Sequence, residues 1–130
     1  MSINTHLKID QTLNGTVTEN GKGYAKVTLL TLPIMIADSE GLVHGGFIFG
    51  AADYCAMVSV NNPLVVLAKS EVKFIAPVKV GEDITFEGKI LEENGNRVSV
   101  TVIAMVQDTK VFSGTFYTSI LDKHPLCTNL

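Results

Sequence analysis

The chain has 130 residues, of which 46% are hydrophobic and 18% charged, with a formal net charge of −3. This length predicts one domain, and a positive mean hydropathy of +0.30 excludes a disordered chain, which would be polar and highly charged. The acidic balance, with Arg97 as the sole arginine, argues against nucleic acid and anionic membranes as partners. So apolar a composition in so small a domain also indicates oligomerisation.

The chain ends and the two cysteines set expectations about location. The first ten residues lack the apolar run of a signal peptide, and no apolar stretch reaches the ~20 residues that a membrane span needs. Cys55 lies in an apolar run and Cys127 in a polar tail, so we expect no disulfide and a cytoplasmic location. We expect a single domain over residues 1–130, with a short flexible tail at 122–130.

The N-terminal part of the chain predicts a β-hairpin. The predicted turn, Glu19–Gly23, contains Asn20-Gly21, a strong turn signal, and lies between two segments with a strand-like pattern. The predicted strands are Thr12–Thr18 and Tyr24–Thr31.

Gly46–Val60 departs from the alternating pattern and predicts a buried helix. The segment is rich in alanine, lacks proline and is apolar almost throughout. Between Glu40 and Lys69, Asp53 is the one charged residue. A helix that is apolar on nearly every side has to be enclosed by other elements.

The remainder of the chain predicts strands that enclose this helix. In a long strand at Leu64–Ile75, alternate residues are expected to face it: Leu64, Val66, Ala68, Val72 and Phe74. Three alternating segments separated by short turns follow, which indicates an antiparallel meander: Asp83–Leu91, Val98–Gln107 and Val111–Leu121. The expected fold is α+β, with five to six curved antiparallel strands wrapped around one central helix. This is the hotdog fold.

Asp53 is the residue that most suggests chemistry. A carboxylate within a buried helix costs several kcal/mol unless it is paired, hydrated or protonated. Burial predicts a raised pKa for Asp53, which suits a general base. The alternative is a structural aspartate that is bonded to neighbouring backbone or hydroxyl groups.

Gly45 and Gly46 stand at the expected start of the helix, where backbone N–H groups are unpaired and carry the positive end of the helix dipole. Helical spacing places Gly46, Gly50, Asp53 and Met57 along one stripe. A carbonyl polarised by these N–H groups, together with a carboxylate, indicates hydrolytic acyl transfer. Close helix–strand packing is the alternative role of the glycines, and capping that of His44.

The sequence shows no sign of a metal or cofactor site. His6, His44 and His124 are dispersed, and the motifs of serine hydrolases and of phosphate-binding loops are missing. We therefore expect neither a metal nor a cofactor.

Residues Asp38–Gly46, reading Asp-Ser-Glu-Gly-Leu-Val-His-Gly-Gly, precede the helix that carries Asp53. This arrangement resembles the signature of PaaI-type hotdog-fold acyl-CoA thioesterases, except that Asp38 stands where that family usually has asparagine. The resemblance implies that the Gly45 amide polarises the thioester carbonyl and that Asp53 attacks it or activates water. It also implies an acyl-CoA ligand, a catalytic role for the signature's His44, and a site between the protomers of a homodimer or tetramer.

Ser70–Val78 and Gly81–Asp83 resemble the long strand of the same family and the turn that leaves it. By this resemblance, with the glycines of the helix stripe, the expected substrate-binding residues are Asp38, Gly46, Gly50, Ser70, Lys73, Phe74, Pro77 and Lys79. Lys73 and Lys79 are expected to hold the CoA phosphates.

Lys110–Phe116 also resembles the ligand domain of FapR-type regulators of fatty-acid synthesis, which bind an acyl-CoA without hydrolysing it. Two hypotheses therefore remain. The first is an acyl-CoA thioesterase that uses Asp53. The second is a non-catalytic module with a regulatory role that binds acyl-CoA or acyl-carrier protein.

Overall fold

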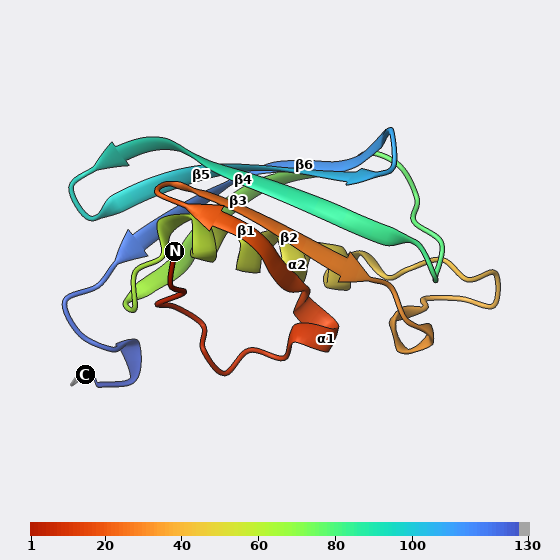
Figure 1. Ribbon diagram of the computed structural model, residues 1–130, viewed down its shortest axis with the longest axis horizontal. Coiled ribbons are helices and arrows are strands. Elements are labelled where there is room, and N and C mark those ends of the chain that lie inside the picture. Colours follow the sequence, from red (N-terminus) through yellow and green to blue (C-terminus); the bar gives the residue numbers. More distant parts are fainter. Residues whose placement is uncertain (128–130) are drawn as a thin grey trace.

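The computed structural model describes residues 1–127, and its longest helix, α2 (Gly45–Val60), lies beneath one antiparallel sheet (Figure 1). Six strands form this sheet in the order β1-β2-β4-β5-β6-β3. Their bounds are β1 Thr16–Gly21, β2 Tyr24–Leu30, β3 Val65–Phe74, β4 Asp83–Asn94, β5 Arg97–Val106 and β6 Thr109–Ile120. The short helices are α1 Gln11–Asn14, η1 Pro33–Met35 and η2 Pro125–Cys127. The predicted α+β hotdog fold is confirmed.

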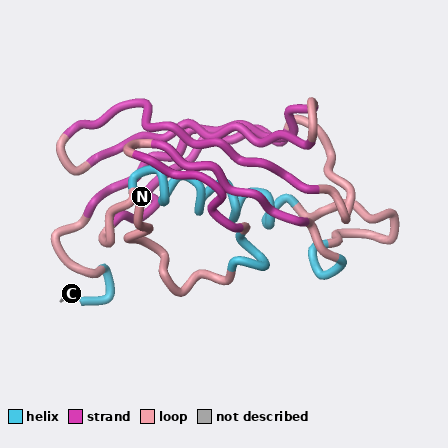
Figure 2. The backbone as a smooth tube through the Cα atoms, viewed as in Figure 1, coloured by secondary structure: helices cyan, strands magenta, loops and turns pink. Residues whose placement is uncertain are grey.

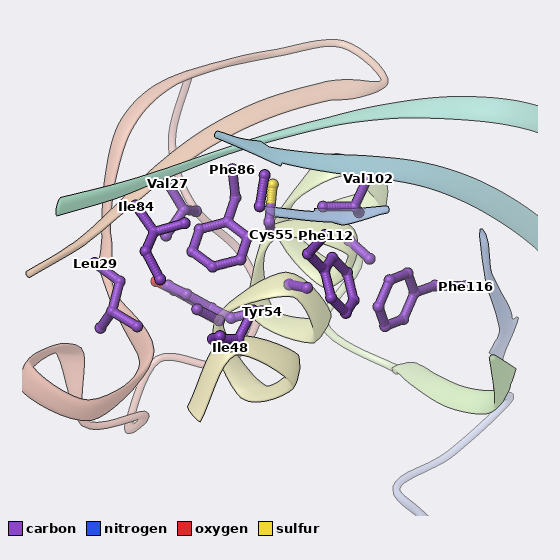
Figure 3. Close-up of a cluster of buried hydrophobic side chains, with 14 of the residues drawn as sticks. Val27, Leu29, Ile48, Tyr54, Cys55, Ile84, Phe86, Val102, Phe112 and Phe116 are labelled. Carbon is purple, nitrogen blue, oxygen red and sulfur yellow. The ribbon is translucent and has the colours of Figure 1, made fainter. Parts of the chain in front are cut away.

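The core lies between the sheet and α2, where the side chains of Phe86, Phe112 and Phe116 meet the helix (Figure 3). The alternation predicted for the last three strands is confirmed. Phe86, Val100 and Phe112 are fully buried at expected positions of β4, β5 and β6. On the helix side, Tyr54 and Cys55 are buried in the same cluster.

The N-terminal segment differs from its prediction. Residues 11–14 form the short helix α1 instead of the start of a strand, because Asp10 caps it: its carboxylate accepts the N–H of Leu13. Gly15, with a φ of +90°, then turns the chain into β1. The predicted hairpin is present, and its turn is Lys22-Gly23, at the end of the predicted turn Glu19–Gly23, because Gly21 pairs with Tyr24 in the ladder.

The facing residues predicted for β3 are wrong in its first half. A bulge at Ala68 shifts the register between Leu67 and Lys69. Before the bulge, Val65 and Leu67 pack against the core in place of Val66 and Ala68. After it, Val72 and Phe74 face α2 as expected. One extra residue in a strand exchanges the faces on which the following side chains lie. A prediction based on strict alternation along the sequence does not allow for such a residue.

Of the tail expected at 122–130, residues 128–130 lie outside the described residues, and Pro125–Cys127 form η2. Within residues 1–127, no helix is long and apolar enough to cross a membrane.

Candidate functional site

The start of α2 is held from both sides. Val43 N–H donates to Val78 O and His44 N–H to Met35 O, at 2.9 and 2.8 Å. His44 is the N-cap residue, and its Nδ1 accepts the N–H of Gly46 at 2.9 Å. The expected capping alternative for His44 is therefore observed. One helical N–H is thereby satisfied, while that of Gly45 has no acceptor anywhere in residues 1–127.

A cavity of about 330 Å³ opens beside Gly45. Its lining includes Leu42, Ile48, Phe74 and Pro77, so its walls are apolar. A Cβ atom added to Gly45 would lie 3.0 Å from Cε1 of Phe74, which places the ring against the glycine backbone. The structure thus brings together Gly45, Phe74 and Pro77, three of the residues expected from the sequence. The unpaired N–H of Gly45 therefore lies beside a cavity with mainly apolar walls.

Asp53 lies on the side of α2 that faces away from the sheet. The predicted stripe is observed in its first part: Gly46, Gly50 and Asp53 retain exposure, whereas Met57 is fully buried. Within the described chain, the buried Oδ1 of Asp53 has no hydrogen-bond partner. Desolvation raises the pKa of Asp53 from 3.8 to about 6, in the predicted direction. A structural role would require partners that this carboxylate lacks.

Gly45 and Asp53 of one protomer are too far apart to act on one carbonyl group. They lie eight residues apart on α2, which corresponds to a rise of about 12 Å. A reacting atom has to lie about 3 Å from both the attacking group and the oxyanion donors. The two groups can therefore meet at one thioester only if they come from different copies of the chain.

The remaining expected binding residues are dispersed. Asp38 is exposed, and its Oδ1 accepts the N–H groups of Glu40 and Leu42, so it orders the turn before α2. Ser70 is half-buried on the helix side of β3, opposite Phe116. Lys73 lies on the outer face of the sheet, beside Thr101 and Ser113. Lys79 is exposed and lines, with Pro77, a second pocket next to the apolar cavity.

Residues 1–15, here named the N-terminal strap, form a part of the site region that sequence reasoning missed. The strap runs along the side of α2 opposite the sheet (Figure 2). A Cβ atom at Gly50 would lie 3.1 Å from Oδ1 of Asn14, so α1 covers the stripe next to Asp53. Asp10 before α1 and Gly15 after it are helix-boundary signals that could have revealed this helix.

No three His, Cys, Asp or Glu side chains lie close enough to hold a metal ion in the part of the chain that is described. Cys55 is buried in the core, where desolvation raises the pKa of its thiol to about 12. It is therefore not poised as a nucleophile.

Comparison with known proteins identifies the family. The model of the thioesterase superfamily matches residues 40–113, which is more than half of the chain. The chain belongs to the thioesterase superfamily. Solved structures match this superfamily member over most of its length. A protein from Pyrococcus horikoshii (PH1136) has 44% sequence identity, covers 97% of both chains and superposes with a TM-score of 0.95.

Two more distant structures show the same fold. The PaaI protein of Escherichia coli has 17% identity over 88% of this chain and 84% of its own, with a TM-score of 0.79. The protein smu.793 of Streptococcus mutans, solved bound to acetyl CoA, has 22% identity over 92% of this chain and 99% of its own, with a TM-score of 0.79. The expected likeness to PaaI is thus confirmed at the level of superfamily and fold.

Curated relatives are longer proteins. A protein of Aquifex aeolicus named methylthioribose-1-phosphate isomerase is 49% identical over 121 residues, which are 93% of this chain but 26% of that protein. The transcription factor FapR of Shouchella clausii is 30% identical over 84 residues, 65% of this chain and 44% of FapR. The chain therefore spans between about a quarter and a half of the length of these relatives.

Proposed function

We propose that this thioesterase-superfamily protein hydrolyses acyl-CoA thioesters, with Asp53 as base or nucleophile and the Gly45 N–H as oxyanion donor. The observation that carries the proposal is the state of Asp53. Its carboxylate lacks a partner within the described residues, and its pKa of about 6 leaves it ionised yet basic near neutral pH. Membership of the thioesterase superfamily supports hydrolysis of a thioester as the reaction of this carboxylate.

As a base, the ionised Asp53 removes a proton from water while the oxygen of that water attacks the thioester carbon. The negative charge that forms on the carbonyl oxygen is stabilised by the Gly45 N–H and the start of the helix. The carbon–sulfur bond then breaks, and the proton passes to the leaving CoA sulfur. As a nucleophile, Asp53 would instead attack the thioester carbon and displace the CoA thiolate, which leaves an anhydride. Water then hydrolyses this anhydride, which frees the acid and the Asp53 carboxylate, and a proton passes to the CoA thiolate. Neither route needs a metal or a cofactor.

The proposed active site is shared between two protomers. The rise of about 12 Å along α2 prevents one protomer from supplying both groups. β3 is an edge strand of the sheet, with an unpaired ladder side on which a second copy can pair. We propose an isologous dimer joined through β3, in which the Gly45 of one copy lies near the Asp53 of the other.

Two observations support CoA as the carrier of the acyl group. A neighbour of the same fold was solved bound to acetyl CoA. In this chain, Lys79 lines a second surface pocket, which shares Leu42, Pro77 and Val78 with the cavity beside Gly45. A cation at this position can meet phosphate groups at the protein surface. Lys73 lies on the other face of the sheet and fits this role less well.

The second candidate is a module that binds acyl-CoA or acyl-carrier protein without turnover. Similarity to the transcription factor FapR favours it. In such a module, the unpaired Asp53 would weaken binding because its charge is desolvated for no gain. The two candidates therefore predict opposite effects for removal of this charge.

The test is thioester hydrolysis by wild type, Asp53→Asn and Asp108→Asn over a panel of short, long and aryl acyl-CoA substrates. Asp108 is exposed in the turn between β5 and β6, so its variant makes the same chemical change away from the site. We expect Asp53→Asn to lower kcat by about 10²–10⁴ and Asp108→Asn to match wild type. Wild-type protein that binds acyl-CoA but hydrolyses none of the panel would favour the binding module.

A further inference from the structure

The N-terminal strap contacts α2 on both sides of Asp53. Toward the end of the helix, Asn4 N–H donates to Asn61 Oδ1 at 2.7 Å, and Asn61 Nδ2 donates to Ser2 O at 2.8 Å. The His6 ring lies 6.4 Å from that of Tyr54, the residue after Asp53. Toward the start of the helix, α1 reaches Gly50. Asp53 therefore lies on α2 between two contacts that the strap makes with this helix.

The contact at Gly50 is made by a side chain that is fixed in place. Asn14 Nδ2 donates to Asp10 O at 3.0 Å, and the Asn14 N–H donates to the same oxygen at 3.0 Å. Gly15, directly after it, is buried against β2, where a Cβ atom would lie 2.5 Å from Val27 Cγ1. The end of α1 thus has little freedom to move away from α2.

Gly50 lies about one turn before Asp53 on the half-buried stripe of α2, a rise of about 4.5 Å. An acyl group whose thioester carbon is at Asp53 and which extends along the stripe meets Asn14 after this distance. In the other direction, the stripe ends at Met57, which is fully buried. Within one protomer, the stripe on either side of Asp53 is thus covered by Asn14 at Gly50 and ends at the buried Met57.

We propose that Asn14 is a specificity-determining residue that restricts the substrate to short acyl chains. This inference rests on the proposed function, because it places the acyl group of an acyl-CoA along the stripe at Asp53. The side chain of Asn14 blocks a longer acyl chain at Gly50. It can lie there because Gly50 has no side chain of its own.

The experiment measures kcat/KM of wild type, Asn14→Ala, Asn14→Gln and Thr12→Ala with acetyl-, butanoyl-, hexanoyl-, decanoyl- and palmitoyl-CoA. Thr12 is exposed on the same helix α1, so Thr12→Ala controls for general loosening of the strap. We expect wild type and Thr12→Ala to prefer the short chains. Asn14→Ala should raise kcat/KM for the first rejected chain by about tenfold or more, the range for one methylene group in a pocket. Asn14→Gln should reject chains that wild type accepts.

A parallel binding series separates this inference from the proposed function. Calorimetry with the same acyl-CoA set is carried out on Asp53→Asn, alone and combined with Asn14→Ala. If wild type hydrolyses nothing but Asn14→Ala shifts the binding preference to longer chains, the thioesterase proposal fails and the role of Asn14 is supported. The inference is overturned if wild type already prefers palmitoyl-CoA, if no acyl-CoA binds, or if Asn14→Ala and Thr12→Ala keep the wild-type chain-length profile.

Discussion

At the scale of single residues, Asp53 opposes the stability of the fold. Burial raises its pKa from 3.8 to about 6 in the folded chain. A carboxyl group with a raised folded pKa contributes stability that is fully present below the unfolded pKa and is lost as pH rises through the folded pKa. Over this range the difference corresponds to about 3 kcal/mol. The protein therefore tolerates a destabilising charge at the position where the proposed hydrolysis needs a base.

This cost predicts the effect of Asp53→Asn on stability. At pH 8 we expect the variant to have a free energy of unfolding up to about 3 kcal/mol higher than wild type, because the desolvated charge is gone. Near pH 4 the two proteins should differ little. Urea unfolding at fixed protein concentration measures both values, with Asp108→Asn as the exposed control. Equal stability of Asp53→Asn and wild type at pH 8 would show that the carboxylate is solvated or paired.

At the scale of elements, the approach of α2 to the sheet depends on Gly88 of β4. A Cβ atom there would lie 2.6 Å from Ser59 Oγ and 3.1 Å from Cys55 Sγ, both buried on α2. Ser59 Oγ is held because it donates to Cys55 O at 2.8 Å. The helix can therefore lie this close to the sheet because position 88 lacks a side chain.

Gly88→Ala should destabilise the fold by about 1–3 kcal/mol, the range for overpacking a core. Gly21→Ala is the matched control, since a Cβ atom at Gly21 meets nothing within 4 Å. Thermal unfolding of the two variants compares them directly. A Gly88→Ala protein as stable as Gly21→Ala would contradict the packing described for α2 and β4.

The elements that could be predicted from the sequence are those whose hydrophobic pattern matches the faces that they bury. The predicted core positions of strands β4 to β6 alternate in the sequence, and α2 is apolar almost throughout, so both were identifiable from spacing alone. The bulge at Ala68 was not, because it depends on one extra residue. The helix α1 was missed although Asp10 and Gly15 mark its two ends in the sequence. Of the candidate site, Asp53 and the glycines could be predicted. The strap could not, since its contact with Gly50 joins residues that are distant in the chain.

At the scale of the whole molecule, a single chain holds two incomplete halves of the proposed site. The apolar cavity with the Gly45 N–H lies at the start of α2, and the carboxylate lies about 12 Å farther along the helix. Phe74 and Ile75, at the end of β3, are 54% and 48% exposed beside that cavity. Exposed apolar side chains next to an unpaired strand edge are typical of an interface between copies.

The shared site can be tested with two variants that each damage one half. Gly45→Pro removes the N–H that would bind the oxyanion. Proline suits the first position of a helix, and His44 before it already has an extended backbone with a ψ of 132°. The added ring atoms meet Phe74, whose exposed side chain can move aside. Asp53→Asn removes the base or nucleophile in the other variant.

The decisive measurement is acyl-CoA hydrolysis by Gly45→Pro and Asp53→Asn protomers, each alone and after mixing and exchange. Each variant alone should be nearly inactive, because every site lacks one group. In mixed dimers one of the two sites receives an intact Gly45 and an intact Asp53, so equal mixing should restore about a quarter of wild-type activity. Mixtures that stay as inactive as the separate variants, with exchange verified by sedimentation of dimers, would contradict a site shared between two protomers.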